Sequence, residues 1–372
     1  MSVPRKISPD VAARPGVAGL IPYEPGRPDW EVKAEYGLDE VVKLASNESP
    51  LAPPKIAVEA ACHALKGASR YPDSKGVELK RRLTERIGLD ASWIMLGNGA
   101  EECIRLVAGA FVRHGGQNVI PEPGFDAYET AVLLLGGRKV SSALSGTAAN
   151  LEDALAKVGP ETDAVWICSP NNPTGGTVSK TEMDSFLERL PENVVVVMDE
   201  AYREFVTDPE AAKADDYFRT DHRVIGLRTF SKAFALAGLR VGYLTAHPSL
   251  VSLMERVRLP FNVSLPAQAA ALAVLDDEQY VKSHVELIVE EREFLRASLS
   301  ERGLEVPASQ TNFLFFEIPM RGRDAFRAMM AEGVIVKSGD IWGCENYLRV
   351  TVGLREHNLK FLSAMDKVLA KR

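Results

Sequence analysis

The sequence lacks any segment that could cross a membrane and any pattern of a secretory signal. Its longest aliphatic runs, 131–135 and 194–198, are far shorter than the roughly 20 apolar residues that a membrane helix needs. The N-terminal segment MSVPRKISPD has no apolar core of the kind that signal peptides carry. We therefore expect no membrane partner and no export.

Cysteine and basic charge are also in short supply. The four cysteines form no Cys-x-x-Cys pair and have no histidine at zinc-ligand spacing, which predicts reduced thiols in the cytoplasm. We expect Cys103 and Cys168 to be buried packing residues. The six histidines are scattered, so we predict no metal site. Lysine and arginine number 44 against 51 acidic residues, a net charge of −7, which leaves no basic excess for binding nucleic acid.

The remaining composition is that of a globular protein with about two domains. The chain has 372 residues, of which 46% are hydrophobic and 26% charged. Residues 1–37 are rich in proline and glycine and are predicted to form an extended arm. We predict an arm with part of the small domain over 1–45, a large domain over 46–265 and a small C-terminal domain over 266–372.

The large domain alternates helical segments with aliphatic strands, which predicts an α/β fold with a mostly parallel sheet covered on both faces. Its predicted strands are 93–96, 118–120, 164–168, 193–198 and 224–227. The small domain reads as an α+β unit, because a long charged helix over 277–302 is followed by shorter elements. Those elements are strands over 312–318, 334–337 and 347–352, and helices over 324–332 and 355–369.

Four loops that follow predicted strands carry polar groups, and ligands bind outside the carboxyl ends of parallel strands. The loop 97–102 (GNGAEE) opens a helix, whose first N–H groups could bind a phosphate or could simply be capped. Glu102 stands where a dinucleotide fingerprint has its third glycine, so that motif does not fit. The loop 171–175 (NNPTG) is by itself no more than a turn.

The other two loops carry charged residues in apolar surroundings. Asp199 follows a run of valines, where a buried carboxylate costs several kcal/mol unless a cation meets it, for example a protonated heteroaromatic nitrogen. A helix N-cap would explain Asp199 equally well. Lys232 follows the strand 224–227, and a desolvated lysine has a lowered pKa and acts as nucleophile and base. Arg240 lies in an apolar segment, where its guanidinium needs an anion such as phosphate.

In this order, the segments 171–175, 199–202 (DEAY) and 231–243 resemble the pyridoxal-phosphate-dependent aminotransferases of fold type I. The chain is most similar to their histidinol-phosphate aminotransferase branch, from about residue 23 to the C-terminus. The segments that carry this closer likeness are 44–50 (LASNESP), 70–73 (RYPD), 97–102 and 347–353 (YLRVTVG). The resemblance implies a large domain with a seven-stranded, mostly parallel sheet, a smaller α+β domain and an N-terminal arm.

The resemblance also implies pyridoxal 5′-phosphate as the cofactor. Lys232 would hold it covalently and move the proton between Cα and C4′, while Asp199 would pair with the pyridinium nitrogen. Asn172 and Tyr202 would hydrogen-bond the ring's 3-oxygen, and Phe125 would stack on the ring. The cofactor's phosphate would be held by Ala100, Glu101, Ser231, Arg240 and, from the neighbouring subunit, Tyr71. This last contact implies a homodimer with shared active sites.

On the substrate side, the resemblance implies that Arg349 clamps a carboxylate with both arms of its guanidinium. Asn47 and Tyr23 would lie near the substrate, and Lys337 would face its distal end. Lys337 departs from the branch, which usually has arginine there, and lysine keeps the charge but loses the fork. Phe125 stands where many relatives have tyrosine, and Phe261 where some do, which makes the pocket slightly more apolar.

We therefore predict a ping-pong aminotransferase that exchanges an amino group between an amino donor and a 2-oxo acid. The predicted substrates are histidinol phosphate as amino donor and 2-oxoglutarate as acceptor, in histidine biosynthesis. The alternative is an aromatic amino acid such as phenylalanine. A threonine-phosphate decarboxylase shares most of the motifs. A non-catalytic regulator would need a basic DNA-binding module, and a nicotinamide-dependent oxidoreductase would need the missing dinucleotide fingerprint.

Overall fold

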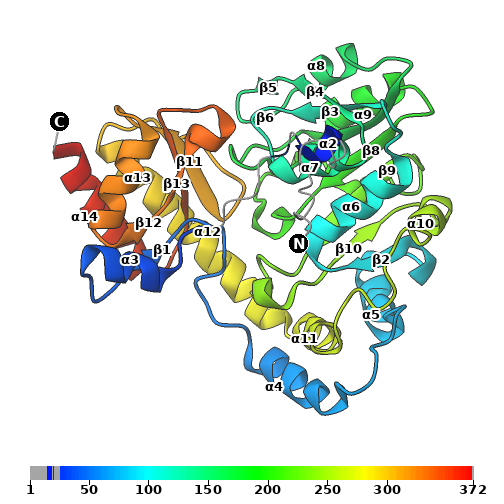
Figure 1. Cartoon of the computed structure of the whole chain (residues 1–372), viewed down its shortest axis with the longest axis horizontal. Helices are drawn as coiled ribbons and strands as arrows, with labels where there is room; N and C mark the ends of the chain where they lie inside the picture. The colour runs from blue at the N-terminus through cyan, green and yellow to red at the C-terminus, as the bar shows by residue number, and fades with distance from the viewer. Residues whose placement is uncertain (1–14, 19, 21–25, 371–372) are drawn as a thin grey trace, which may run out of the picture.

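The computed structural model describes residues 15–18, 20 and 26–370, which form two lobes (Figure 1). The helix α12 (Glu278–Glu301) runs from the larger lobe into the smaller one. No helix in the described part of the chain is long and apolar enough to span a membrane. Tyr23, predicted near the substrate, lies outside the described residues.

The larger lobe is built on a seven-stranded sheet with the order β2-β10-β9-β8-β7-β3-β4. Neighbouring strands pair in parallel except at β10, which is antiparallel to both β2 and β9. The predicted α/β fold with a mostly parallel sheet is therefore confirmed. The strands are β2 (Ile94–Gly97), β3 (Gln117–Pro121), β4 (Arg138–Ser142), β7 (Thr162–Cys168), β8 (Val195–Asp199), β9 (Val224–Thr229) and β10 (Gly242–Thr245). β4 and β10 were not among the predicted strands.

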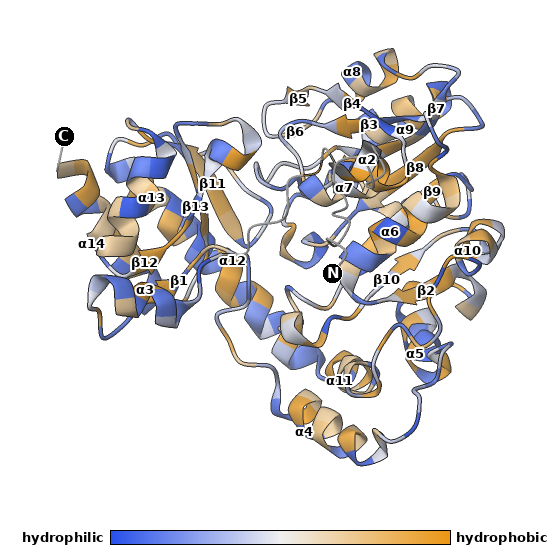
Figure 2. Ribbon diagram, viewed as in Figure 1, coloured by the Kyte–Doolittle hydropathy of each residue, from blue (hydrophilic) through white to orange (hydrophobic). Residues whose placement is uncertain are grey.

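Helices cover both faces of this sheet, because its central strands are apolar on both sides. In β7, Trp166 and Cys168 pack toward α6 (Gly99–Phe111) and α7 (Asp126–Leu134). The alternate residues of β7 pack on the opposite face, toward α8 (Leu151–Ala156) and α9 (Lys180–Arg189). The apolar strands lie between helices whose outer surfaces are hydrophilic (Figure 2). This two-sided burial holds the ends of the strands in fixed positions.

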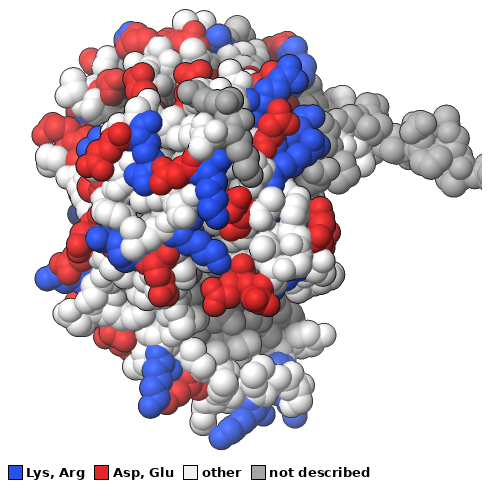
Figure 3. Space-filling view, turned by 90° about the vertical axis from the view of Figure 1, so that its left-hand side faces the viewer, with Lys and Arg blue, Asp and Glu red and all other residues white. Residues whose placement is uncertain are grey.

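The smaller lobe combines two short sheets with helices. β11 (Phe313–Glu317), β14 (Tyr347–Thr351) and β13 (Lys337–Ser338) form an antiparallel sheet in that order. β1 (Val42–Lys43) pairs in parallel with β12 (Val334–Ile335), which brings the segment after β1 to the boundary between the lobes. The covering helices are α12, α13 (Gly322–Ala331) and α14 (Arg355–Ala370). On the face shown in Figure 3, acidic and basic side chains are interspersed.

The predicted extended arm over 1–37 is wrong in its last part, where α3 (Asp29–Tyr36) is a helix. It begins after Pro28 and ends at Gly37, whose φ of 65° is the left-handed conformation that glycine adopts readily. Val32 is fully buried in a cluster with Met330 and Ile335, so packing on the small lobe stabilises the helix. The density of prolines before Asp29 concealed this helix in the sequence.

Three helices form the outer part of the larger lobe. α11 (Leu265–Asp276) packs against α4 (Lys55–Ala64) and α5 (Val77–Ile87). The proposed domain division assigns α11 to the small domain, and this division remains a proposal. The other described elements are the hairpin β5 (Leu144–Ser145) and β6 (Ala148–Ala149), α10 (Pro248–Met254), the short α2 (Pro15–Ala18) and several turns of 3₁₀ helix.

Candidate active site

A cavity of about 380 Å³ opens at the carboxyl ends of β7, β8 and β9, where the two lobes meet. Every predicted site residue in the described chain lines it except Tyr71, which is 81% exposed on the surface of the larger lobe. The predicted residues that the structure brings together are Asn47, Ala100, Glu101, Phe125, Asn172, Asp199, Tyr202, Ser231, Lys232, Arg240, Lys337 and Arg349.

Lys232 follows β9 and extends across the cavity toward the segment after β1. Its Nζ donates hydrogen bonds to the carbonyl oxygens of Asn47, at 2.9 Å, and Ser46, at 3.3 Å. Burial, helped by the positive charge of Arg349, lowers the pKa of Lys232 to about 8. Part of the Lys232 population is therefore a neutral amine near pH 8, and a neutral amine can act as a nucleophile and base.

Asp199 ends β8 at the base of the cavity and is 3% exposed. Its Oδ2 accepts a hydrogen bond of 2.7 Å from the hydroxyl of Tyr128, and its Oδ1 accepts one of 3.0 Å from the N–H of Ala201. Burial raises the pKa of Asp199, and these two hydrogen bonds oppose that rise. Tyr128 was not among the predicted site residues, because its position three residues after Phe125 does not by itself show that its hydroxyl reaches Asp199.

The N-terminus of α6 and Arg240 form a corner suited to an anion. Arg240 has a left-handed backbone (φ 56°), which is uncommon for a residue other than glycine. A Cβ atom on Gly99 would lie only 2.6 Å from an Arg240 Nη atom, so the guanidinium closely approaches the first turn of the helix. The guanidinium of Arg240 and the first N–H groups of α6 therefore point toward one place, and Ser231 lines the same cavity. A phosphate matches this arrangement.

The carboxylate of Glu102 stays out of that corner. It accepts a hydrogen bond of 2.7 Å from the side-chain amide of Asn262 and another from the backbone N–H of Asn98. Glu102 therefore caps its own helix, and its charge does not occupy the anion position.

On the small-lobe side, Arg349 is buried and held in place at two points. Its Nη1 donates to Oδ1 of Asn172 at 2.6 Å, and its Nη2 donates to the carbonyl oxygen of Ala45 at 2.8 Å. The guanidinium carbon also lies 5.0 Å from the centre of the Trp342 ring. Lys337 is the direct cross-strand neighbour of Arg349, so both side chains project from the same face of the β13–β14 pair.

Asn47 connects several of these groups, and its backbone is also left-handed (φ 53°). Its side-chain amide donates to the hydroxyl of Tyr202 at 3.0 Å, and its Oδ1 accepts from the hydroxyl of Thr351 at 3.1 Å. Burial raises the pKa of Tyr202 to about 12, so this phenol keeps its proton at neutral pH. The unusual backbone of Asn47 is therefore held by side chains from both lobes.

Of the four cysteines, Cys103 and Cys168 are buried, as expected. Cys168 lines the cavity, and burial raises its pKa to about 12. It is therefore a protonated thiol at neutral pH and a poor nucleophile.

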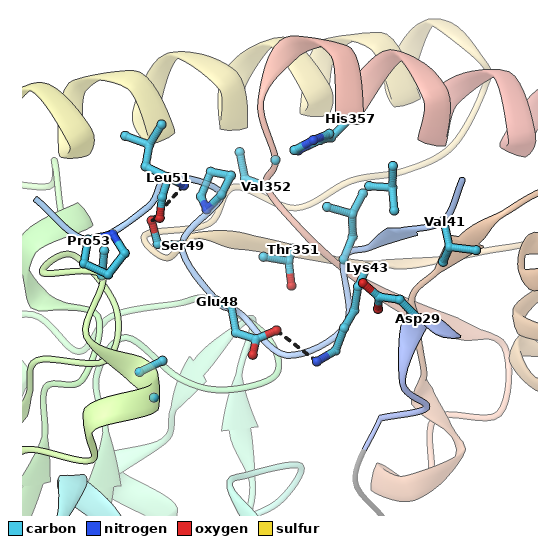
Figure 4. A pocket seen from close by; sticks show the side chains of 17 residues that line it. Asp29, Val41, Lys43, Glu48, Ser49, Leu51, Pro53, Thr351, Val352 and His357 are labelled. Carbon is cyan, nitrogen blue, oxygen red and sulfur yellow. Dashed lines mark hydrogen bonds and ion pairs between the residues drawn. The ribbon is translucent and has the colours of Figure 1, made fainter. Parts of the chain in front are cut away.

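A second cavity has a volume of about 510 Å³. Figure 4 shows the side chains that line it. The two share Glu48, Ala237 and Gly238 as lining residues. In the second cavity Lys43 and Glu48 point toward each other and form an ion pair of 3.1 Å. Because Lys43 is neutralised by this carboxylate, and because Asp199 and Lys232 lie in the smaller cavity, the smaller cavity is the candidate active site.

Comparisons with known proteins agree with this geometry. The model of the family "Aminotransferase class I and II" matches residues 39–364. The chain is 39% identical to a histidinol-phosphate aminotransferase of Moorella thermoacetica, over 96% of this chain and 93% of that one. It is 41% identical to histidinol-phosphate aminotransferase 2 of Methylococcus capsulatus, over 96% of this chain and 98% of that one.

A solved structure leads to the same family. The crystal structure of histidinol-phosphate aminotransferase from Sinorhizobium meliloti in complex with pyridoxal-5′-phosphate is similar to this chain, with a TM-score of 0.88 and 25% sequence identity. The likeness covers 97% of this chain and 98% of that one. The chain therefore belongs to the class I and II aminotransferases and is a pyridoxal-phosphate-dependent transaminase.

Proposed function

We propose that the enzyme transfers an amino group between histidinol phosphate and 2-oxoglutarate. The observation that carries this proposal is the pair of cations, Arg349 and Lys337, that project from one strand pair into the cavity that also holds Lys232. Such a wall suits substrates that carry a carboxylate or a phosphate. The names of relatives that are 37–41% identical over nearly their full length support the same substrate.

The residues of the cavity suit pyridoxal phosphate at both of its ends. We propose that Arg240, Ser231 and the first N–H groups of α6, at Ala100 and Glu101, bind its phosphate. Asp199 would bind the ring nitrogen at the other end. The left-handed Arg240 close to Gly99 is the structural feature that fits this assignment, since it aims donors at one point.

The ring would lie between these ends. We propose that Phe125 covers its face and that Asn172 and Tyr202 donate hydrogen bonds to its oxygen. When bound, the cofactor supplies an electron sink for the bonds at the substrate's α-carbon.

Lys232 then has the task of moving a proton. Its amine, with a pKa lowered to about 8, can accept the proton from the substrate's α-carbon and return it. Arg349 would hold an anionic group of the substrate and thereby fix the α-carbon within reach of Lys232. Lys337 would bind the distal phosphate of histidinol phosphate or the distal carboxylate of a dicarboxylic acid.

An aromatic amino acid is the second candidate substrate. Lys337 offers a point charge instead of the arginine fork, and the cavity is lined by apolar residues, Phe125, Ile341 and Trp342. These features would accept the side chain of phenylalanine.

The test compares kcat/KM for histidinol phosphate and phenylalanine as amino donors, with 2-oxoglutarate as acceptor. We expect histidinol phosphate to be preferred by about tenfold or more, because phenylalanine offers a carboxylate to Arg349 but has no phosphate for Lys337, which is the loss of one charge-assisted contact. A preference for phenylalanine would contradict the proposal and leave the family assignment in place.

We also propose a homodimer in which Tyr71 reaches the cofactor phosphate of the partner subunit. Tyr71 stacks on Phe261 with ring centres 4.5 Å apart, and Leu259 nearby in the chain is 69% exposed. An exposed aromatic and aliphatic cluster of this kind is typical of a protein–protein contact. A location in the cytoplasm is likewise a proposal, which rests on the cysteine pattern.

A mixing experiment tests the shared site. Tyr71→Ala and Lys232→Ala subunits are each expected to be weakly active or inactive. A dimer of one subunit of each kind would have one intact site if Tyr71 acts on its partner. Activity should therefore reappear after the two variants are unfolded and refolded together. If Tyr71 acts within its own subunit, or if the enzyme is a monomer, no activity returns.

A further inference from the structure

We propose that Tyr128 is a positioning residue that keeps Asp199 oriented toward the cofactor ring and in its charged form. The proposal rests on the assignment of Asp199 to the ring nitrogen. It adds a residue outside the cavity lining to the catalytic machinery.

Tyr128 is fully buried, and its aromatic ring has little freedom to move. The ring stacks on Trp166, with centres 5.3 Å apart and planes at 24°, and meets the edge of Phe125 at 5.6 Å. Trp166 is fixed in turn, because its Nε1 donates to Oδ1 of the buried Asn118 at 3.2 Å. The Tyr128 hydroxyl is therefore held at one point, 2.7 Å from Oδ2 of Asp199.

Besides this hydroxyl, the groups among the described residues that favour the charged form of Asp199 are the Ala201 N–H and the more distant positive charge of Lys232. Among the described residues, no basic side chain lies within ion-pair distance of Asp199. Its protein hydrogen bonds come from the Ala201 N–H and from Tyr128. A buried carboxylate with two donors remains an anion more readily than one with a single donor. Because each carboxylate oxygen accepts one of these hydrogen bonds, the plane of the carboxylate is also held in one orientation.

The donor and the ring-stacking residue share one helix. Phe125 is the N-cap of α7 and Tyr128 lies in its first turn, and the two rings meet edge to face. α7 thus presents Phe125 to the face of the cofactor ring and supports Asp199 at the ring nitrogen. A shift of this helix would change both contacts together.

The variant Tyr128→Phe removes the hydroxyl and keeps the ring stacked on Trp166. We expect the dissociation constant of pyridoxal phosphate to rise about tenfold, the size of one hydrogen bond to a charged group. We also expect the pH midpoint of the cofactor's visible absorption to move upward. Without its donor, Asp199 holds the proton on the ring nitrogen less firmly, and the lysine–cofactor linkage then keeps its own proton to a higher pH.

The matched control is Tyr217→Phe. Tyr217 is also buried in the larger lobe, but it packs on the opposite face of the sheet, and its hydroxyl donates to the carbonyl oxygen of Lys180. We expect this variant to bind the cofactor with the affinity and the pH midpoint of the unchanged enzyme. If both variants lose a similar amount of thermal stability, that loss is the general cost of removing a buried hydroxyl, and a cofactor effect seen only in Tyr128→Phe is specific to Tyr128.

A double variant shows whether Tyr128 acts through Asp199. In an Asp199→Asn enzyme, the further change Tyr128→Phe should alter neither the dissociation constant nor the midpoint. The inference is overturned if Tyr128→Phe lowers the melting temperature but leaves both cofactor readouts unchanged. It is also overturned if the effects of the two substitutions simply add. Because both readouts use the cofactor alone, a preference for phenylalanine as substrate would overturn the proposed function and leave this inference standing.

Discussion

The two walls of the active-site cavity are built in different ways. On the large-lobe wall, Asp199 and Lys232 stand at the ends of β8 and β9, two central strands of a sheet buried on both faces. On the small-lobe wall, Arg349 and Lys337 come from β14 and β13, and β13 has only two residues. The buried sheet places the groups proposed for the cofactor, and the small, partly exposed sheet places those proposed for the substrate.

From this difference we expect substitutions in the small-lobe wall to alter the choice of substrate, and substitutions in the large-lobe wall to abolish the reaction. The large-lobe wall carries the segments 171–175, 199–202 and 231–243, on which the resemblance to fold-type-I aminotransferases rests. The small-lobe wall carries lysine at 337, where the resemblance to the histidinol-phosphate branch implies arginine. β13 is short and half-buried and lies next to a 3₁₀ turn (Gly339–Trp342), so we expect a substitution there to disturb the core less than one at the end of a central strand.

The largest expected effect comes from the large-lobe wall. Lys232→Ala should lower kcat by roughly a thousandfold or more with every amino donor, because it removes the proton-transferring amine. The visible band of the covalently held cofactor should disappear as well. Activity assays and absorption spectra check both effects. The exposed Lys180→Ala serves as control, and an Lys232→Ala enzyme that retains the band would refute the role of this lysine.

A change on the small-lobe wall should separate substrates instead of abolishing activity. We expect Lys337→Ala to lower kcat/KM for histidinol phosphate about tenfold, the worth of one charge-assisted contact, and to leave that for phenylalanine nearly unchanged. Lys337→Arg should raise kcat/KM for histidinol phosphate, because it restores the fork. Equal losses for both donors would mean that the two walls do not divide their tasks as proposed.

The smallest effect is electrostatic and links the two walls. Covalent capture of pyridoxal phosphate by the apoenzyme needs the neutral Lys232 amine, so its rate should rise with pH and level off above about pH 8. The positive charge of Arg349 contributes to the lowered pKa of Lys232. In Arg349→Gln that pKa should rise toward its ordinary value, and the rate curve should move to higher pH. Rates of absorbance change across this pH range give the midpoint, and a shift to lower pH would contradict the coupling.

Much of the large-lobe wall could be predicted from sequence, for a physical reason. Asp199 ends the aliphatic strand β8, and Lys232 lies in the loop three residues after the end of β9. The carboxyl ends of parallel strands meet at one edge of a sheet. A charged residue near the end of a buried strand has few structural roles, so the residues around Asp199 and Lys232 were enough to predict a functional site. The small-lobe residues Arg349 and Lys337 have no comparable local pattern, and only the family resemblance pointed to them.

Three features, Tyr128 and the strands β4 and β10, could not be predicted because they depend on contacts between distant segments. Tyr128 is one tyrosine on an amphipathic helix, and nothing nearby in the chain shows that its hydroxyl faces Asp199, 71 residues away. β4 has the polar sequence RKVSS, because it is the edge strand of the sheet. β10 has only four residues and runs against its neighbours, so it has no place in a simple strand–helix alternation.

The close approach of Arg240 to Gly99 has a consequence for mutational tolerance. Gly99 has a φ of 76°, which disfavours any other residue, and a side chain there would also force the guanidinium to move. Arg240, in contrast, could be replaced by lysine with the charge retained. In a saturation library screened for growth, the glycine should therefore be the less replaceable of the two, although it contributes no charge and no side chain. We therefore expect natural variation to be more limited at Gly99, which leaves room for the guanidinium, than at Arg240, which supplies the guanidinium.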